Sequence, residues 1–69
     1  MKNVSVIKEL REAQGLSQVE LGAKAHINPQ LISNWESGRN RPNSQSISKL
    51  SYGLGVSRNY LVDKIYGYA

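Results

Sequence analysis

A helix-start signal that recurs along the chain constrains the fold more than any other feature of the sequence. Each time, an apolar residue precedes a polar cap residue, and a second apolar residue lies five positions after the first, the pattern of a hydrophobic staple. Three segments carry the signal: Leu16-Ser17 with Leu21, Ile27-Asn28 with Ile32, and Val56-Ser57 with Leu61. Glu20 adds a capping-box partner for Ser17, and Pro29 suits the first helical position after Asn28. Each segment therefore predicts the beginning of a helix.

The helix ends are marked by residues that interrupt the apolar periodicity. Gly15, Gly38 and Gly55 each follow a periodic segment and predict its end, Gly15 as a left-handed cap. No segment alternates apolar and polar residues between hairpin signals, so no strand is predicted. At 69 residues the chain has the size of one small domain. The sequence predicts a single all-α domain, residues 1–69, with five helices at about residues 5–14, 18–25, 29–37, 44–54 and 58–66.

Positive charge is concentrated in the second half of the chain. Residues 1–36 carry four Lys or Arg and four Glu, whereas residues 37–69 carry five Lys or Arg and one Asp. A basic half beside a neutral half indicates an anionic partner. A basic surface that is simply solvated explains the charge equally well, so the charge alone does not decide.

The second and third predicted helices have the layout of a helix-turn-helix, two helices joined by a short turn. The staple turns Ile32 inward, and Trp35 shares its face, so Trp35 is expected in the core and not on a surface that stacks on bases. The opposite face carries a stripe of Pro29, Gln30, Ser33 and Asn34.

This stripe is uncharged and contains both hydrogen-bond donors and acceptors. Base edges in the major groove present mixed donor and acceptor patterns, and an Asn or Gln side chain can bridge adenine N6 and N7. Arg39 and Arg41 follow the helix directly, where a docked helix would bring the next loop toward phosphates. The pattern favours binding to double-stranded DNA over a solvated polar face.

The sequence resembles the Cro and repressor-like helix-turn-helix domains, also called XRE-like, over about residues 5–66. The resemblance rests on short segments in a fixed order: Gly15-Leu16-Ser17-Gln18 with Glu20-Leu21, Ile32-Ser33-Asn34-Trp35-Glu36-Ser37-Gly38, Arg41-Pro42, and Leu54-Gly55-Val56-Ser57 with Tyr60-Leu61. It implies a compact lambda-repressor-like fold and a transcriptional regulator, expected to be a repressor. Such a protein acts as a homodimer, at least on DNA, at a pseudo-palindromic operator.

The resemblance also implies roles for residues at matching positions. The positions that read bases in the family correspond to Asn28, Pro29, Gln30, Ser33 and Asn34. Those that lie along the DNA backbone correspond to Ser17, Gln18, Arg39, Asn40 and Arg41, and Ser17 and Gln18 also brace the recognition helix. The inward ion pair that ties the first helix to the third corresponds to Arg11 and Glu36.

Two positions depart from the family pattern. His26 lies where relatives often have glycine, and histidine tolerates a positive φ better than most residues, so the turn is expected to survive. Pro29 replaces a long polar side chain found in many relatives. Because proline cannot make a bidentate base contact, it is expected to press on a thymine methyl group, and the operator sequence cannot be transferred from a relative.

Other functional classes have little support in the sequence. The chain has no cysteine, and His26 is its only histidine, so no metal site, catalytic base or nucleophile is expected. No enzyme activity, cofactor or small-molecule effector is predicted. The apolar runs are too short for a membrane span, and a cytoplasmic location is expected.

Two alternatives and one surface stay open. The protein could be an antitoxin that regulates its own operator, or a helical protein-interaction module that does not bind DNA. Tyrosine suits interfaces, so we expect a dimer contact in the C-terminal third, which contains four tyrosines. Of these, Tyr60 is expected in the core beside Val56; the others are Tyr52, Tyr66 and Tyr68.

Overall fold

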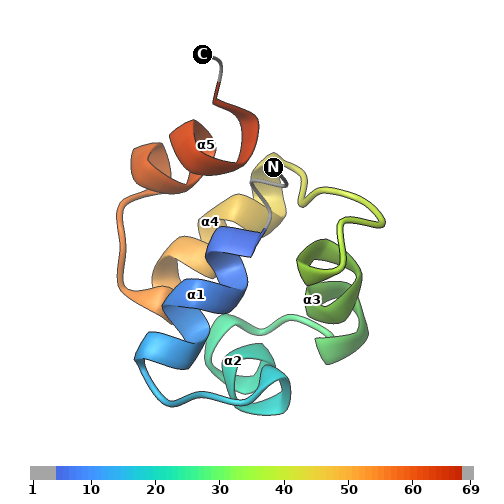
Figure 1. Cartoon of the computed structure of the whole chain (residues 1–69). Coiled ribbons are helices and arrows are strands. Elements are labelled where there is room, and N and C mark those ends of the chain that lie inside the picture. The colour runs from blue at the N-terminus through green and yellow to red at the C-terminus, as the bar shows by residue number, and fades with distance from the viewer. Residues whose placement is uncertain (1–4, 68–69) are drawn as a thin grey trace.

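Capping residues set the helix boundaries of this protein, as a computed structural model shows for residues 5–67. Five helices follow one another without any strand in this range, which confirms the predicted all-helical fold (Figure 1). They are α1 Ser5–Ala13, α2 Gln18–Ala25, α3 Pro29–Glu36, α4 Ser44–Leu54 and α5 Arg58–Tyr66. Helices α1 and α3 end one residue earlier than predicted. At both ends, backbone hydrogen bonds join residues three apart in place of four, as from Gly15 N to Glu12 O and from Gly38 N to Trp35 O, which is a tighter 3₁₀-type turn.

The predicted caps are formed. Ser17 Oγ accepts a hydrogen bond from Glu20 N at 3.0 Å, and Ser17 N donates to Glu20 Oε1 at 2.8 Å, which completes the capping box. Asn28, Asn43 and Ser57 cap α3, α4 and α5 in the same way, each accepting from a backbone N–H of the first turn. Each cap of this kind contributes about 1 kcal/mol to helix stability. Helices this short are marginal on their own, so packing against the core is also needed to stabilise them.

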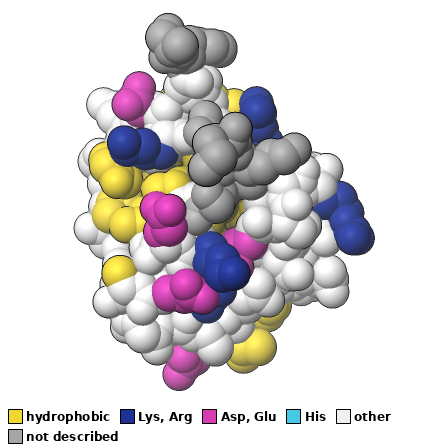
Figure 2. All heavy atoms as spheres, viewed as in Figure 1, with side chains coloured by type: hydrophobic (Ala, Val, Ile, Leu, Met, Phe, Trp, Pro, Cys, Tyr) yellow, Lys and Arg dark blue, Asp and Glu magenta, His cyan; other side chains and the backbone are white. Residues whose placement is uncertain are grey.

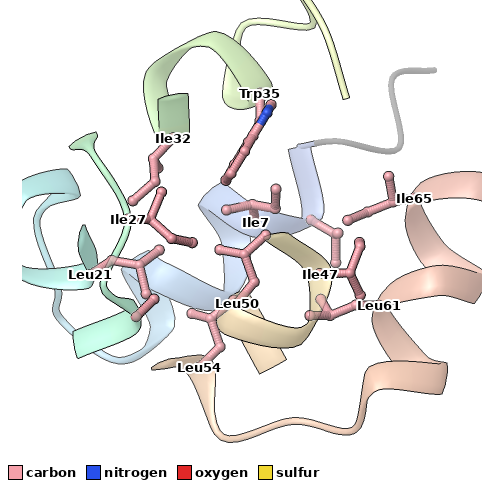
Figure 3. Close-up of a cluster of buried hydrophobic side chains, with 12 residues drawn as sticks. Ile7, Leu21, Ile27, Ile32, Trp35, Ile47, Leu50, Leu54, Leu61 and Ile65 are labelled. Atoms are coloured by element: carbon pink, nitrogen blue, oxygen red, sulfur yellow. The ribbon is translucent and has the colours of Figure 1, made fainter. Parts of the chain in front are cut away.

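The core lies where α1 and α4 pass between the other helices (Figures 1 and 3). Every described helix contributes to it, and its members are Val6, Ile7, Leu21, Ala25, Ile27, Ile32, Trp35, Ile47, Leu50, Leu54, Leu61 and Ile65. Trp35 is buried as predicted, with its ring directed toward the cluster in Figure 3. Burial of Ile32 and Trp35 fixes the rotation of α3 about its own axis, and this determines which face it presents to solvent.

The prediction for Tyr60 is wrong. Its side chain is 41% exposed, and Lys64 Nζ lies 5.7 Å from the centre of its ring. The staple partner of Val56 is Leu61, which is fully buried. One step along a helix rotates a side chain by about 100°, so the burial of Leu61 turns Tyr60 to the surface.

Close packing of small residues joins α2 to α4. A Cβ added to Gly53 would lie 2.7 Å from Ala25 Cβ, so glycine is needed for this approach. None of the helices in residues 5–67 is long and apolar enough to cross a membrane.

Candidate nucleic-acid interface

The turn between α2 and α3 depends on a left-handed residue. His26 has φ 59° and ψ 46°, and the N–H of this cap donates to Gly22 O. Within residues 5–67 it is the one non-glycine residue with positive φ. The expectation that histidine would take the usual glycine conformation at this turn is confirmed.

Gly22 is a residue of this site that the sequence reading did not identify. A Cβ at this position would lie 2.6 Å from Ile27 O and 3.1 Å from Pro29 Cγ. Because the backbone after the turn passes directly over Gly22, α3 can approach α2 only when this side chain is absent. The sequence did contain a signal for this role, because a glycine inside a predicted helix lowers helix stability and often has a packing reason.

Replacing Gly22 with alanine is expected to lower the free energy of unfolding by about 1–2 kcal/mol, because overpacking outweighs the gain in helix propensity. Urea denaturation measures the change. The control is Ala23→Gly at the adjacent exposed position, which reports the alanine preference of α2 alone. A more stable Gly22→Ala variant would contradict the close approach.

The outward face of α3 carries amide side chains that contact each other. Gln30 Nε2 donates to Asn34 Oδ1 at 3.3 Å, one helical turn apart. Gln30 is exposed, whereas Ser33 and Asn34 are half-buried. This contact does not use Gln30 Oε1 or Asn34 Nδ2. The pair therefore presents one acceptor and one donor close together. This is the complement that an adenine edge requires.

The first two residues assigned to base reading have structural roles as well. Asn28 Oδ1 accepts from Gln30 N at 2.8 Å, so its oxygen is engaged in capping α3. Pro29 is half-buried and lies against α2 at Gly22. The Asn28 amide N–H₂ group is not used in this cap, and Asn28 is exposed, so this group can donate to a ligand.

A charged network anchors α3 from behind. Arg11 Nε donates to Glu36 Oε2 at 2.8 Å and Arg11 Nη2 to Glu36 Oε1 at 3.0 Å, the bidentate pair that the resemblance implied. Arg11 Nη1 also donates to Leu16 O at 2.7 Å. Hydrogen bonding to Glu36 raises the pKa of the Arg11 guanidinium above its ordinary value, so this group stays charged. The network links α1, the loop after it and the end of α3.

Gln18 belongs to this network. Its Nε2 donates to Glu36 Oε1 at 3.0 Å, which is the bracing role expected from the resemblance. The same amide group has a second N–H that this bond does not use, so the phosphate contact of Gln18 stays a prediction. Ser17 is exposed at the beginning of α2, with its oxygen engaged in the cap. Its hydroxyl can still donate to a phosphate.

The loop after α3 is exposed and basic. Arg39, Asn40 and Arg41 are all exposed, and Arg39 N donates to Asn34 O at 2.9 Å, which holds the loop against the end of α3. Arg41 Cζ lies 5.8 Å from the centre of the Tyr66 ring. In Figure 2, acidic side chains lie over α1, α2 and α5. The bond from Arg39 N to Asn34 O places the basic loop next to the end of the helix that carries the amide stripe.

No cluster of three His, Cys, Asp or Glu suited to hold a metal ion occurs within residues 5–67. The buried side-chain nitrogen and oxygen atoms of the same residues all have hydrogen-bond partners. The described surface therefore offers groups that bind through hydrogen bonds and charge.

Comparison with known proteins agrees with this geometry. A family model described as helix-turn-helix matches residues 7–61, and the chain belongs to this XRE-like helix-turn-helix family. Such a domain suggests DNA binding. No solved structure matches the chain.

Relatives share part of their length with this chain. Endothelial differentiation-related factor 1 of Homo sapiens is 39% identical over 74% of this chain and 34% of its own length. Putative multi-protein-binding factor 1 of Yarrowia lipolytica is 44% identical over 67% of this chain and 30% of its own. Multiprotein-bridging factor 1 of Schizosaccharomyces pombe is 38% identical over 72% and 34%. The chain thus spans about a third of the length of the curated relatives that it matches.

Proposed function

We propose that this protein is a transcriptional regulator that inserts α3 into the major groove of duplex DNA and represses transcription from a pseudo-palindromic operator. The observation that carries the proposal is the pairing of Gln30 with Asn34 on the outward face of α3, beside an exposed basic loop. An α-helix fits the major groove, where paired amides can discriminate between bases.

The remaining contacts follow from the same orientation. Asn28, Ser33 and the edge of Pro29 would complete the base-reading face, while Ser17, Arg39, Asn40 and Arg41 would contact phosphates. The network around Glu36 holds α3 rigid relative to α1 and α2, so little ordering would be needed on binding. In this proposal the protein binds without catalysing a reaction, and the lack of cysteine supports a cytoplasmic location.

A homodimer would place two copies of α3 about 34 Å apart, one helical turn of DNA. Tyr52 and Tyr60 are exposed and suit such a contact, whereas Tyr66 is half-buried against the loop after α3. Tyr68 lies outside the described residues.

A second candidate is a protein-binding module within a larger regulator. The names of two relatives, multiprotein-bridging factor and multi-protein-binding factor, favour it. Val19 on α2 is 67% exposed and Tyr52 on α4 is 76% exposed, so apolar contact area is available. Fluorescence anisotropy with a labelled mixed-sequence duplex separates the two candidates, because binding that persists at near-physiological salt supports the first and its absence there supports the second.

Replacing Arg41 with alanine is expected to weaken binding to every duplex and to reduce the slope of log affinity against log salt by about one unit, because one fewer counterion is released. The measurement is anisotropy at several salt concentrations. Lys8→Ala, at an exposed position on α1 outside the proposed interface, removes the same charge and serves as the control. Equal slopes for the Arg41 variant and the unmodified protein would exclude a phosphate contact.

A further inference from the structure

The end of α5 and the basic loop after α3 are joined by two contacts of one side chain. Tyr66 Oη donates a hydrogen bond to Pro42 O, and the Tyr66 ring lies beneath the Arg41 guanidinium, with Cζ 5.8 Å from the ring centre. Pro42 is fully buried, so its carbonyl belongs to a fixed part of the chain. Tyr66 thus contacts two consecutive residues that lie more than twenty positions before it in sequence.

These contacts matter because the loop between α3 and α4 has no regular hydrogen bonding of its own. Its beginning is held by the bond from Arg39 N to Asn34 O at 2.9 Å. Its end is held by the bond from Tyr66 to Pro42. Arg41 lies between these points, and without Tyr66 its long side chain would sample many rotamers.

The contact with the ring leaves N–H donors of the guanidinium able to bind an anion. A guanidinium is planar, and its face can lie against an aromatic ring. Its five N–H donors point outward in the plane of the guanidinium, toward other partners. Ring and phosphate therefore do not compete for the same atoms. No carboxylate lies within 4.0 Å of Arg41 in residues 5–67, since the ion pairs found there involve Arg11.

We propose that Tyr66 is a positioning residue that holds Arg41 and the loop around it in the conformation that contacts a DNA phosphate. The proposal rests on the DNA-binding function proposed above. It assigns the end of α5, remote in sequence from the helix-turn-helix, a role in the affinity of the interface. That role acts through Arg41, without a contact between Tyr66 and DNA.

A double-mutant cycle on binding tests this role. The variants are Tyr66→Leu and Tyr66→Phe, each with Arg41 retained and with Arg41→Ala, and the probe is a labelled mixed-sequence duplex. Tyr66→Leu is expected to weaken binding about 3- to 10-fold when Arg41 is present and less than 2-fold when it is absent. Tyr66→Phe keeps the ring and loses only the hydroxyl, so a loss of about 2-fold is expected.

Equal losses with and without Arg41 would overturn the proposal, because a merely structural role of Tyr66 does not depend on that side chain. Should Tyr66→Leu prove unfolded by circular dichroism, the ring-current shift of Arg41 in the unmodified protein decides, and its absence overturns the proposal. NMR of the free protein adds a readout that does not involve DNA. The side-chain protons of Arg41 are expected to show a ring-current shift that Tyr66→Leu abolishes.

The two readouts separate failure of this proposal from failure of the proposed function. A ring-current shift with no duplex binding by the unmodified protein would overturn DNA binding, and the role of Tyr66 with it. Duplex binding with no ring-current shift would overturn the role of Tyr66 alone.

Discussion

Replacing Arg11 with alanine is expected to lower the free energy of unfolding by about 3–5 kcal/mol, because Glu36 would remain as a buried charge without its partner. The Glu36 side chain is only 6% exposed. Gln18 would be its one remaining hydrogen-bond donor from another side chain, and Leu16 O would also lose its donor. A domain of this size has a total stability of about 3–10 kcal/mol, so the loss removes about a third of it or more.

Urea denaturation followed by tryptophan fluorescence measures this effect, since Trp35 is buried and is the only tryptophan in the chain. Glu12→Ala is the matched control, because Glu12 lies 3.9 Å from Arg11 but its side chain is 58% exposed. It should change stability by no more than about 0.5 kcal/mol. A loss below about 1 kcal/mol for Arg11→Ala would mean that the pair does not anchor α3.

Replacing Asn34 with alanine is expected to reduce discrimination between the preferred duplex and a mixed-sequence duplex by about 1–3 kcal/mol, which is about 5- to 150-fold. The change removes one member of the amide pair and its contact with Gln30. Asn34 O is a backbone atom, so the bonds that it accepts from Arg39 N and Ser37 Oγ remain. Non-specific affinity, which depends on phosphates, should be nearly unchanged.

Competition binding with the two duplexes at one salt concentration measures this ratio. Asn59→Ala on α5 removes an exposed asparagine away from α3 and should leave the ratio as it is. An equal loss of affinity for both duplexes would contradict base reading by Asn34 and would place it with the backbone contacts.

Local signals explain why the helices could be predicted. A cap such as Ser17 and its partner Glu20 are three residues apart, so sequence alone defines the contact that begins the helix. The same holds for the turn at His26, because its left-handed conformation depends on the residue itself and its neighbours. The inward face of α3 followed from the staple between Ile27 and Ile32. Helix starts, the buried Trp35 and the stripe on α3 were therefore all accessible.

Contacts between distant segments could not be read from sequence. The need for glycine at position 22 arises only when the chain after the turn passes over it. The hydrogen bond from Gln18 to Glu36, which lies 18 positions away, depends on how α2 and α3 cross. The position of Tyr66 against Arg41 and Pro42 was not predicted, because it arises only when the end of α5 reaches the loop after α3. The contacts of such residues are determined by packing between helices.

Selection from a randomised duplex pool at near-physiological salt, followed by sequencing of the bound DNA, tests sequence-specific recognition by α3 most directly. We expect a motif with two inverted halves about one helical turn apart to be enriched, and the enrichment to be lost with Asn34→Ala. Binding that appears only at low salt, with no motif enriched, would contradict base reading by α3. It would favour the protein-binding module.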